Sequence, residues 1–160
     1  MVELYLAKLE TPWGVFSVKF HRHGIHELFF PGKNFDDSPR RPLPWPGLAA
    51  ELQRYFDGEP VLFEGYPLDM SCYPPFTRRL LEAVQRIPYG KTYAYREMAE
   101  QAGSPKAWRA AGQALKANRH PLLVPCHRVI LSGGCCGGFS GPAGWKEALL
   151  KLEGALPGGS

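Results

Sequence analysis

The alternation of apolar and polar residues predicts that the chain opens with three short β-strands. Three segments carry the alternation or a short apolar run: residues 4–9, 15–20 and 25–30. Turn-forming residues separate them at 11–14 and 23–24. A polar, proline-rich segment follows, and apolar residues then recur at helical spacing over 48–56, up to a stop at 57–58. Residues 1–66 are therefore expected to form a small antiparallel sheet with one helix.

Helical spacing dominates the rest of the chain, after a proline-containing linker at 67–75. Apolar residues at intervals of three and four predict a helix at its start: Phe76, Leu80, Leu81, Val84 and Ile87. A similar stripe predicts a last helix over 145–152, which Gly154 closes. Residues 76–160 are thus expected to form a separate, mostly helical domain, and the fold class is α+β.

Capping residues delimit two short helices in the middle of this second domain. The first is predicted from Tyr93 to Ala102, and Ser104-Pro105 starts the next, because serine caps a helix and proline fits its first position. The pair predicts a helix-turn-helix. In its second helix three residues face inward and three outward: Trp108, Ala111 and Leu115 inward, Arg109, Gln113 and Lys116 outward. Outward basic residues favour DNA binding, although a packed helical hairpin without function gives the same pattern.

Charge is distributed unequally along the chain. Residues 1–71 hold 7 Lys and Arg against 10 Asp and Glu, a net charge of −3, whereas residues 72–160 hold 12 against 5, or +7. A polyanion would therefore meet the second part, unless these residues are only a solvated face. No apolar run approaches the roughly 20 residues that span a membrane. Four cysteines without a spaced framework indicate a reducing compartment. We expect a soluble, intracellular protein without a membrane partner.

Cys126 is the candidate nucleophile. It follows a predicted buried strand at 122–124, and a cysteine there is most often a small buried apolar residue. A reactive thiolate needs a base or a positive field, which His127 and Arg128 could supply. Since neighbours on a strand point to opposite faces, His127 would act through a water molecule. A glycine-rich segment at 132–144 could bring backbone N–H groups close to a flat ligand.

The segment Pro125-Cys126-His127-Arg128-Val129 resembles the active-site signature of the O6-alkylguanine-DNA alkyltransferases, also called methylated-DNA-protein-cysteine methyltransferases. Further matches lie in order along the second half: Ile87 to Gly90, Tyr95, Met98-Ala99, Gly103 to Ala107, Arg109 to Gly112, Asn118, Ser140-Gly141, Lys146, Leu149-Leu150 and Glu153. The first half is similar only in its sheet-plus-helix, ribonuclease H-like outline. The resemblance implies a single irreversible transfer of an alkyl group from guanine O6 in DNA to cysteine, and leaves the preference between O6-alkylguanine and O4-alkylthymine open.

The resemblance also implies roles at the reacting centre. Cys126 would accept the alkyl group, activated through a water held by His127, which Glu153 orients. The Tyr95 hydroxyl would protonate or hydrogen-bond the purine ring. The pocket for the base would be formed by Val129, Phe139, Ser140, Lys146 and Asn118. In it the Ser140 N–H would face O6, the carbonyls of Cys126 and Val129 would take the exocyclic amine, and Asn118 would fasten the turn before the active site. No cofactor and no metal ion is implied.

On the DNA side, Arg109 has the position of an arginine that fills the gap left by an extruded base. The second helix would lie in the minor groove of double-stranded DNA, where Ala110 and Gly112 permit close approach. Gln113, Lys116 and Arg128 complete the predicted DNA-binding set. The resemblance further implies a monomer that acts in the cytoplasm, with the nucleoid, in a prokaryote and in the nucleus in a eukaryote.

Two rival functions remain at this point. One is a non-catalytic alkyltransferase-like protein that binds damaged bases, but those proteins replace the acceptor cysteine. The other is a cysteine hydrolase, for which only His120 is a candidate base. The chain departs from the family pattern at Arg119-His120, at Phe139 in place of tyrosine and at Cys135-Cys136. Three histidines near the start, His21, His23 and His26, are expected to be surface residues and not metal ligands.

Overall fold

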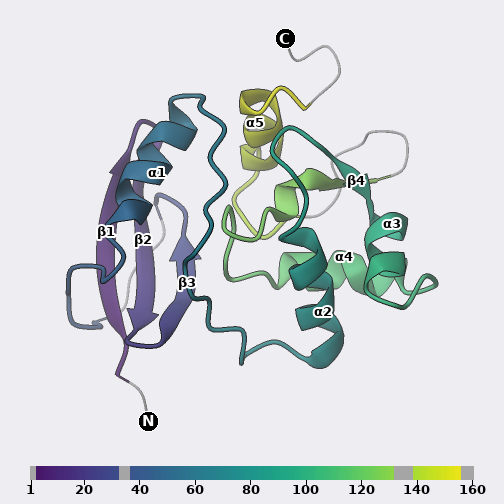
Figure 1. Cartoon of the computed structure of the whole chain (residues 1–160), viewed down its shortest axis with the longest axis horizontal. Helices are drawn as coiled ribbons and strands as arrows, with labels where there is room; N and C mark the ends of the chain where they lie inside the picture. The colour runs from purple at the N-terminus through teal and green to yellow at the C-terminus, as the bar shows by residue number, and fades with distance from the viewer. Residues whose placement is uncertain (1–2, 33–36, 132–138, 156–160) are drawn as a thin grey trace. The chain divides into compact units, whose positions relative to one another are not determined.

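The computed structural model describes residues 3–32, 37–131 and 139–155. The chain divides into two compact units, unit 1 (Met1–Met70) and unit 2 (Ser71–Ser160). The described residues form a three-stranded antiparallel sheet, a two-stranded pair and five α-helices (Figure 1). The predicted mixture of a small antiparallel sheet and helices is confirmed. None of these helices is long and apolar enough to cross a membrane.

Unit 1 consists of the three-stranded sheet and one helix. Its strands β1 (Tyr5–Thr11), β2 (Gly14–His21) and β3 (Gly24–Phe29) pair in the order β1-β2-β3, and α1 (Gly47–Phe56) follows. The apolar residues of the predicted pattern form its core: Phe16, Val18, Ile25, Leu48, Leu52 and Tyr55. Gly14 makes the first turn possible, since its φ is +124° and a Cβ atom there would lie 2.8 Å from Pro31.

The last residues of unit 1 run beside β3. Ile25 donates its N–H to the Pro67 carbonyl at 2.9 Å and accepts from the Asp69 N–H at 2.8 Å. Asp69 also lies 2.8 Å from Nε2 of His21, and His21 is only 7% exposed. The prediction that all three histidines of this region are surface residues is therefore wrong for His21, because the neighbouring segment covers it and supplies a carboxylate partner.

Unit 2 contains the other four helices and the short parallel pair. The helices are α2 (Pro75–Val84), α3 (Tyr95–Gln101), α4 (Trp108–Lys116) and α5 (Trp145–Leu152). The strands β4 (Tyr93–Ala94) and β5 (Val129–Ile130) pair in parallel, directly before α3 and after a 3₁₀ turn, η1 (Cys126–Arg128). Helices α2, α3 and α4 pack on one another, and α5 packs on η1. Their contacts place the cysteine turn among the helices of unit 2.

Three local predictions in unit 2 are wrong. Residues 93–94 form β4 and precede α3, which begins at Tyr95. Ser104-Pro105 does not start α4; these residues make a turn in which the Ala107 N–H donates to the Ser104 carbonyl at 2.9 Å. Residues 122–124 are buried as predicted but form a turn instead of a strand, with Leu122 at φ 70°. Residues 122–124 keep their predicted burial, while their backbone path differs.

Candidate active site

Cys126 begins η1, and its side chain is fully buried, with 0% of its surface exposed. The sulfur lies 3.6 Å from the hydroxyl oxygen of Ser140. Burial raises the pKa of the Cys126 thiol above its ordinary value, and hydrogen bonds with Asn118 and Ser140 and the charge of Lys146 offset only part of this effect. The group is therefore a neutral thiol at neutral pH. It requires a base before it can act as a nucleophile.

His127, the residue after Cys126, forms a buried pair with Glu153. Nε2 of His127 lies 2.6 Å from Oε2 of Glu153, and the two side chains are 1% and 0% exposed. Arg128 contacts the same carboxylate twice, from Nε at 2.8 Å and from Nη2 at 3.1 Å. Burial alone would raise the pKa of Glu153, but the hydrogen bonds and charges of His127 and Arg128 lower it to about 2. Glu153 is therefore ionised at neutral pH.

The ionised carboxylate determines which nitrogen of His127 carries the proton. A carboxylate only accepts hydrogen bonds, so Nε2 is the donor to Glu153. Burial lowers the pKa of His127, and the imidazole is therefore neutral. Nδ1 then carries a lone pair; it is buried and has no hydrogen-bond partner in the part of the chain that the structure describes. The ring presents a free base at its second nitrogen, which is the chemistry that the predicted water relay requires.

The structure corrects two predictions about this segment. Because residues 126–128 form a 3₁₀ turn, the strand alternation that would point Cys126 and His127 to opposite faces does not apply. Arg128, which we predicted to contact DNA, is 7% exposed and donates to Glu153 and to the Ile87 carbonyl. Its charge stabilises the Glu153 carboxylate. No local sequence signal indicates this role, because both partners are distant in the sequence.

Tyr95 and Lys146 lie together on one side of the predicted base pocket. The Lys146 ammonium donates to the Val129 carbonyl at 2.6 Å and lies 5.8 Å from the centre of the Tyr95 ring. Tyr95 is 7% exposed, and a Cβ atom on Gly112 would lie 3.4 Å from its ring. The small residue on α4 therefore also serves the packing of this tyrosine. Lys146 is 4% exposed, so its charge is buried beside Tyr95 and does not lie on the surface.

Asn118 connects α4 to the cysteine turn. Its Nδ2 donates to the Val124 carbonyl at 3.0 Å, and its Oδ1 accepts the His120 N–H at 2.9 Å. Phe139 and Ser140, on the other side of the thiol in the sequence, are half-buried. The structure thus brings Asn118 and Ser140 to the sulfur, as required for a site built around Cys126. The predicted residues Cys135 and Cys136 lie outside the described part of the chain.

The outward face of α4 carries the remaining predicted residues. Four of them are exposed: Arg109, Ala110, Gln113 and Lys116. Arg109 lies with its guanidinium carbon 5.2 Å from the centre of the Trp108 ring, and the guanidinium of Arg96 lies 5.8 Å from the same ring. Stacking of this kind restricts the guanidinium without neutralising it. Sequence reasoning missed this arrangement because it placed Trp108 in the core; the ring is half-buried.

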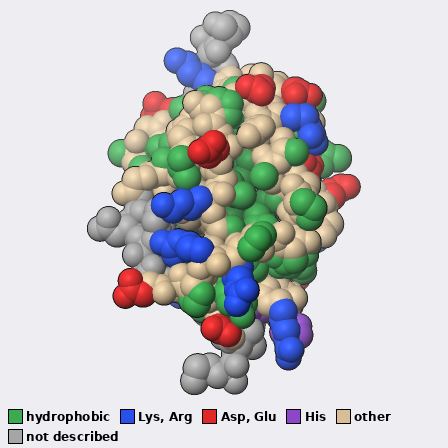
Figure 2. Space-filling view, turned by 90° about the vertical axis from the view of Figure 1, so that its left-hand side faces the viewer, with side chains coloured by type: hydrophobic (Ala, Val, Ile, Leu, Met, Phe, Trp, Pro, Cys, Tyr) green, Lys and Arg blue, Asp and Glu red, His purple; other side chains and the backbone are tan. Residues whose placement is uncertain are grey.

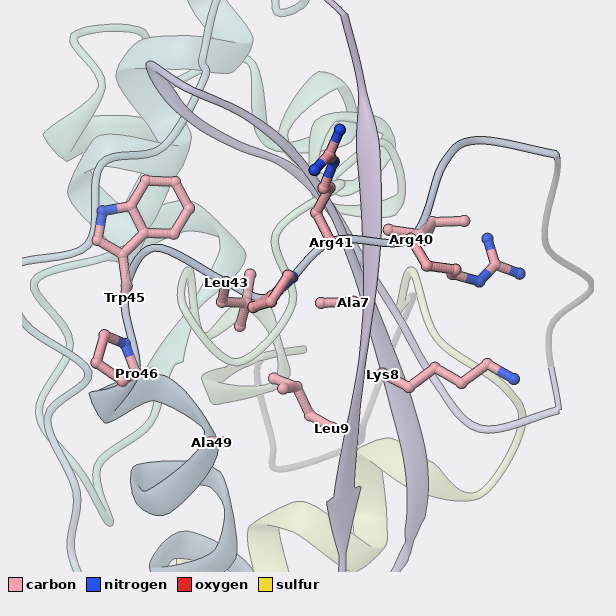
Figure 3. Close-up of a pocket in the computed structure, with 11 residues that line it drawn as sticks. Ala7, Lys8, Leu9, Arg40, Arg41, Leu43, Trp45, Pro46 and Ala49 are labelled. Carbon is pink, nitrogen blue, oxygen red and sulfur yellow. The ribbon is translucent and has the colours of Figure 1, made fainter.

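A pocket of about 710 Å³ lies in unit 1 and contains none of the predicted site residues. Figure 3 shows its lining from β1, from the segment before α1 and from α1 itself, including Leu9, Arg41 and Trp45. These lining residues include no cysteine, histidine or carboxylate. Figure 2 shows a face on which side chains of both charge signs are scattered among apolar ones. The pocket lining offers no thiol, and the face in Figure 2 shows no concentration of one charge sign. The candidate active site therefore remains at Cys126.

Within the described residues, no group of three or more His, Cys, Asp or Glu side chains is placed to hold a metal ion. The structure shows these groups around Cys126: a buried thiol, a neutral imidazole with a free nitrogen, an ionised carboxylate, a phenol and an ammonium. Such a set can remove a proton from sulfur and return one to a leaving group.

Comparison with known proteins gives consistent matches. Residues 75–155 match the DNA binding domain of 6-O-methylguanine DNA methyltransferase. A methylated-DNA-protein-cysteine methyltransferase of Bacillus subtilis is 37% identical, over 93% of this chain and 94% of the relative. A DNA base-flipping protein of Thermus thermophilus is 44% identical, over 74% of this chain and 82% of its own. The crystal structure of Mycobacterium tuberculosis OGT in complex with DNA is similar with a TM-score of 0.81 and 32% identity, over 97% and 96% of the two chains.

Proposed function

This chain belongs to the methylated-DNA-protein-cysteine methyltransferase family, and we propose that it carries out direct-reversal DNA repair with Cys126 as the acceptor of the alkyl group. The observation that carries the assignment is the arrangement around the buried thiol. Cys126 is next to a histidine whose Nε2 is held by an ionised carboxylate and whose Nδ1 is a buried free base. A cysteine that served only packing would not need this pair.

In the proposed reaction the thiol proton passes through a water molecule to Nδ1 of His127. The sulfur forms a bond with the alkyl carbon while the bond between that carbon and guanine O6 breaks. The electron pair of the broken bond stays with the guanine, and the Tyr95 hydroxyl donates a proton or hydrogen bond to the purine ring. The negative charge of Glu153 stabilises the imidazolium that forms. The product is a thioether, which has no leaving group for water to displace.

The base reaches this site only after it leaves the duplex, because O6 lies inside the base stack. In the proposed pocket the Ser140 N–H faces O6, and Phe139 stacks on the extruded ring. The Val129 carbonyl already accepts from Lys146, but a carbonyl oxygen has a second lone pair for the exocyclic amine. Lys146 adds a positive charge close to Tyr95, 5.8 Å from the centre of its ring.

We further propose that α3 and α4 act as a helix-turn-helix that binds the minor groove of double-stranded DNA. The exposed face of α4 carries Arg109, Gln113 and Lys116 and the small residue Ala110, which together allow close approach and phosphate contacts. Arg109 would fill the gap that the extruded base leaves. In this proposal unit 1 has a ribonuclease H-like outline, and the protein acts as a monomer in the compartment that holds the DNA.

The alternative is a protein that extrudes and binds damaged bases without transfer, and the Thermus thermophilus relative is named a DNA base-flipping protein. Intact-mass measurement after mixing with a duplex that contains O6-methylguanine separates the two functions. Transfer adds one methylene mass to the peptide that holds Cys126. The Cys126→Ala variant should lose the mass gain and still bind the duplex, whereas Cys72→Ala, which removes an exposed thiol, should retain the mass gain. An unchanged mass together with tight binding would support the base-flipping function.

A further inference from the structure

Tyr73 and His120 form a buried pair that the proposed reaction does not use. His120 is 0% exposed and Tyr73 is 8% exposed. The Tyr73 hydroxyl lies 2.7 Å from Nδ1 of His120, and the two rings meet edge to face with their centres 5.7 Å apart. The same hydroxyl accepts the backbone N–H of Arg119 at 2.8 Å. One phenol thus contacts two successive residues of the turn that follows α4.

Hydrogen bonds connect this pair to Cys126. The His120 N–H donates to Oδ1 of Asn118 at 2.9 Å. The Asn118 side chain donates from Nδ2 to the Val124 carbonyl at 3.0 Å, and the same carbonyl accepts the Cys126 N–H at 2.7 Å. Asn118 also lowers the pKa of the Cys126 thiol, against the larger effect of burial. The path from the Tyr73 hydroxyl to Cys126 therefore passes through His120, Asn118 and the Val124 carbonyl.

The orientation of the Asn118 amide depends on His120. Since Oδ1 accepts the His120 N–H, the amide NH₂ group must point to the Val124 carbonyl, which also accepts the Cys126 N–H. The opposite orientation would place Oδ1 against a carbonyl oxygen and against the lone pairs of the sulfur. An N–H donor stabilises a thiolate, whereas an oxygen acceptor opposes it. The position of the His120 backbone therefore affects the chemistry of Cys126.

The turn needs an external support of this kind. Leu122 has φ 70°, a left-handed conformation that leucine rarely adopts and that persists only where surrounding contacts hold it. Arg119 and His120 stand between Asn118 and Pro121, so the first part of the turn lacks a rigid proline. The Tyr73 contacts fix these two residues from outside the turn. Val124 completes the support, because its N–H donates to the His120 carbonyl at 2.7 Å.

We propose that Tyr73 and His120 are positioning residues that hold the Asn118 amide with its NH₂ group toward Cys126 and thereby set the reactivity of the acceptor thiol. This inference rests on the proposed function, since it concerns the same sulfur. Tyr73 lies in the segment that enters unit 2, before α2, and touches neither the thiol nor the base. Removal of its hydroxyl should loosen Arg119 and His120 and let the Asn118 amide reorient.

The test compares Tyr73→Phe with Tyr55→Phe, a fully buried tyrosine of unit 1. The rate of alkylation of Cys126 by iodoacetamide, read on its peptide by mass, is measured against pH together with the transfer rate from O6-benzylguanine. Tyr73→Phe should move the pH of half-maximal alkylation upward by about one unit and slow transfer at neutral pH about tenfold. Tyr55→Phe should leave both unchanged. Equal profiles for the parent and Tyr73→Phe would overturn the proposal.

Variants of His120 keep the proposal testable if Tyr73→Phe does not fold. His120→Asn retains an acceptor near the Nδ1 position and should keep most of the transfer rate. His120→Leu removes this acceptor, and its transfer rate should fall about tenfold, as for Tyr73→Phe. Equal rates for the two variants would overturn the positioning role. Failure of the proposed function is recognised separately: the parent protein would then leave O6-benzylguanine unchanged, while the iodoacetamide profiles would still report on the Tyr73 and His120 contacts.

Discussion

Nε2 of His127 lies 2.6 Å from Oε2 of Glu153, and both side chains are buried. The carboxylate is held ionised by Arg128, so it fixes the proton on Nε2 and leaves Nδ1 as the base. The order of thiol, imidazole and carboxylate follows the logic of nucleophile, base and orienting group. Both the thiol and the imidazole are neutral. The thiol therefore reacts only when the imidazole is in place to take its proton, whereas a thiolate formed in advance would need no base.

The first prediction concerns Glu153→Gln. The variant keeps the size of the side chain but removes the negative charge that stabilises the imidazolium. We expect the transfer rate to fall about 10-fold to 1000-fold, the range for a positioned acid or base. Glu147→Gln, on the exposed first turn of α5, is the matched control and should transfer at the parent rate. Parent kinetics in a folded Glu153→Gln protein would show that positive charge alone activates Cys126.

The second prediction is the pH dependence of stability. The folded state lowers the pKa of Glu153 from 4.5 to about 2 because His127 and Arg128 bind its ionised form, despite the opposing effect of burial. A lowered carboxyl pKa stabilises the fold above pH 4.5, and this stabilisation is lost as the pH falls through about 2. The free energy of unfolding should fall by about 3 kcal/mol across this window. Denaturant titrations at several pH values measure it, and a Glu153→Gln protein with an equally steep fall would contradict the assignment.

The capping residues show why parts of the fold could not be predicted from the sequence. Ser104-Pro105 suits the start of a helix, but proline is equally favoured at the second position of a β-turn, and the turn is what forms. The last helix was predicted with its observed bounds, Trp145–Leu152, because its apolar stripe and Gly154 agree. A local sequence pattern predicts which residues are buried and whether an element has the periodicity of a helix or of a strand. It does not decide between two local conformations that the same residues favour.

The candidate active site, too, was only partly predictable from the sequence. Cys126, His127 and Glu153 could be assigned from the resemblance, and the structure places the last two in contact. The role of Arg128 was assigned wrongly, since a basic residue in a positively charged domain suggests a phosphate contact, while its buried partner lies 25 residues away. Tyr73 lies 47 residues before His120, and neither residue belongs to a recognisable motif. Pairs that are distant in the sequence and specific to one chain become visible only in the folded structure.

The third prediction separates base extrusion from chemistry. Arg109→Ala should slow the repair of a duplex far more than the reaction with free O6-benzylguanine, because the free base needs no extrusion. Arg109 stacks on Trp108 on the exposed side of α4, and in the described part of the chain it forms no hydrogen bond with the residues around the thiol. The two reactions are followed on the same preparations by the mass of the Cys126 peptide. Equal losses on both substrates would remove Arg109 from the extrusion step.

The fourth prediction concerns Lys116, an exposed residue in the last turn of α4. A lysine that contacts a phosphate contributes to affinity without reading the sequence. Lys116→Ala should therefore weaken binding evenly across duplexes and reduce the salt dependence of binding by about one unit of slope. Titrations of several duplexes over a range of salt concentrations measure both quantities. A loss that varies with the sequence, or an unchanged slope, would indicate that Lys116 does not contact the backbone of the DNA.

The last prediction is that each molecule acts once and is then less stable. Cys126 is 0% exposed, so an alkyl group on its sulfur adds volume to a site that is already packed. Adding carbon atoms to a packed core typically costs about 1 to 3 kcal/mol, and the spent protein should therefore melt at a lower temperature than the parent. Dealkylation of the duplex should stop at one equivalent, and further substrate should not restart it. Repeated turnover without a cofactor would contradict the thioether product, whereas a single turnover with an unchanged melting temperature would reject only the packing argument.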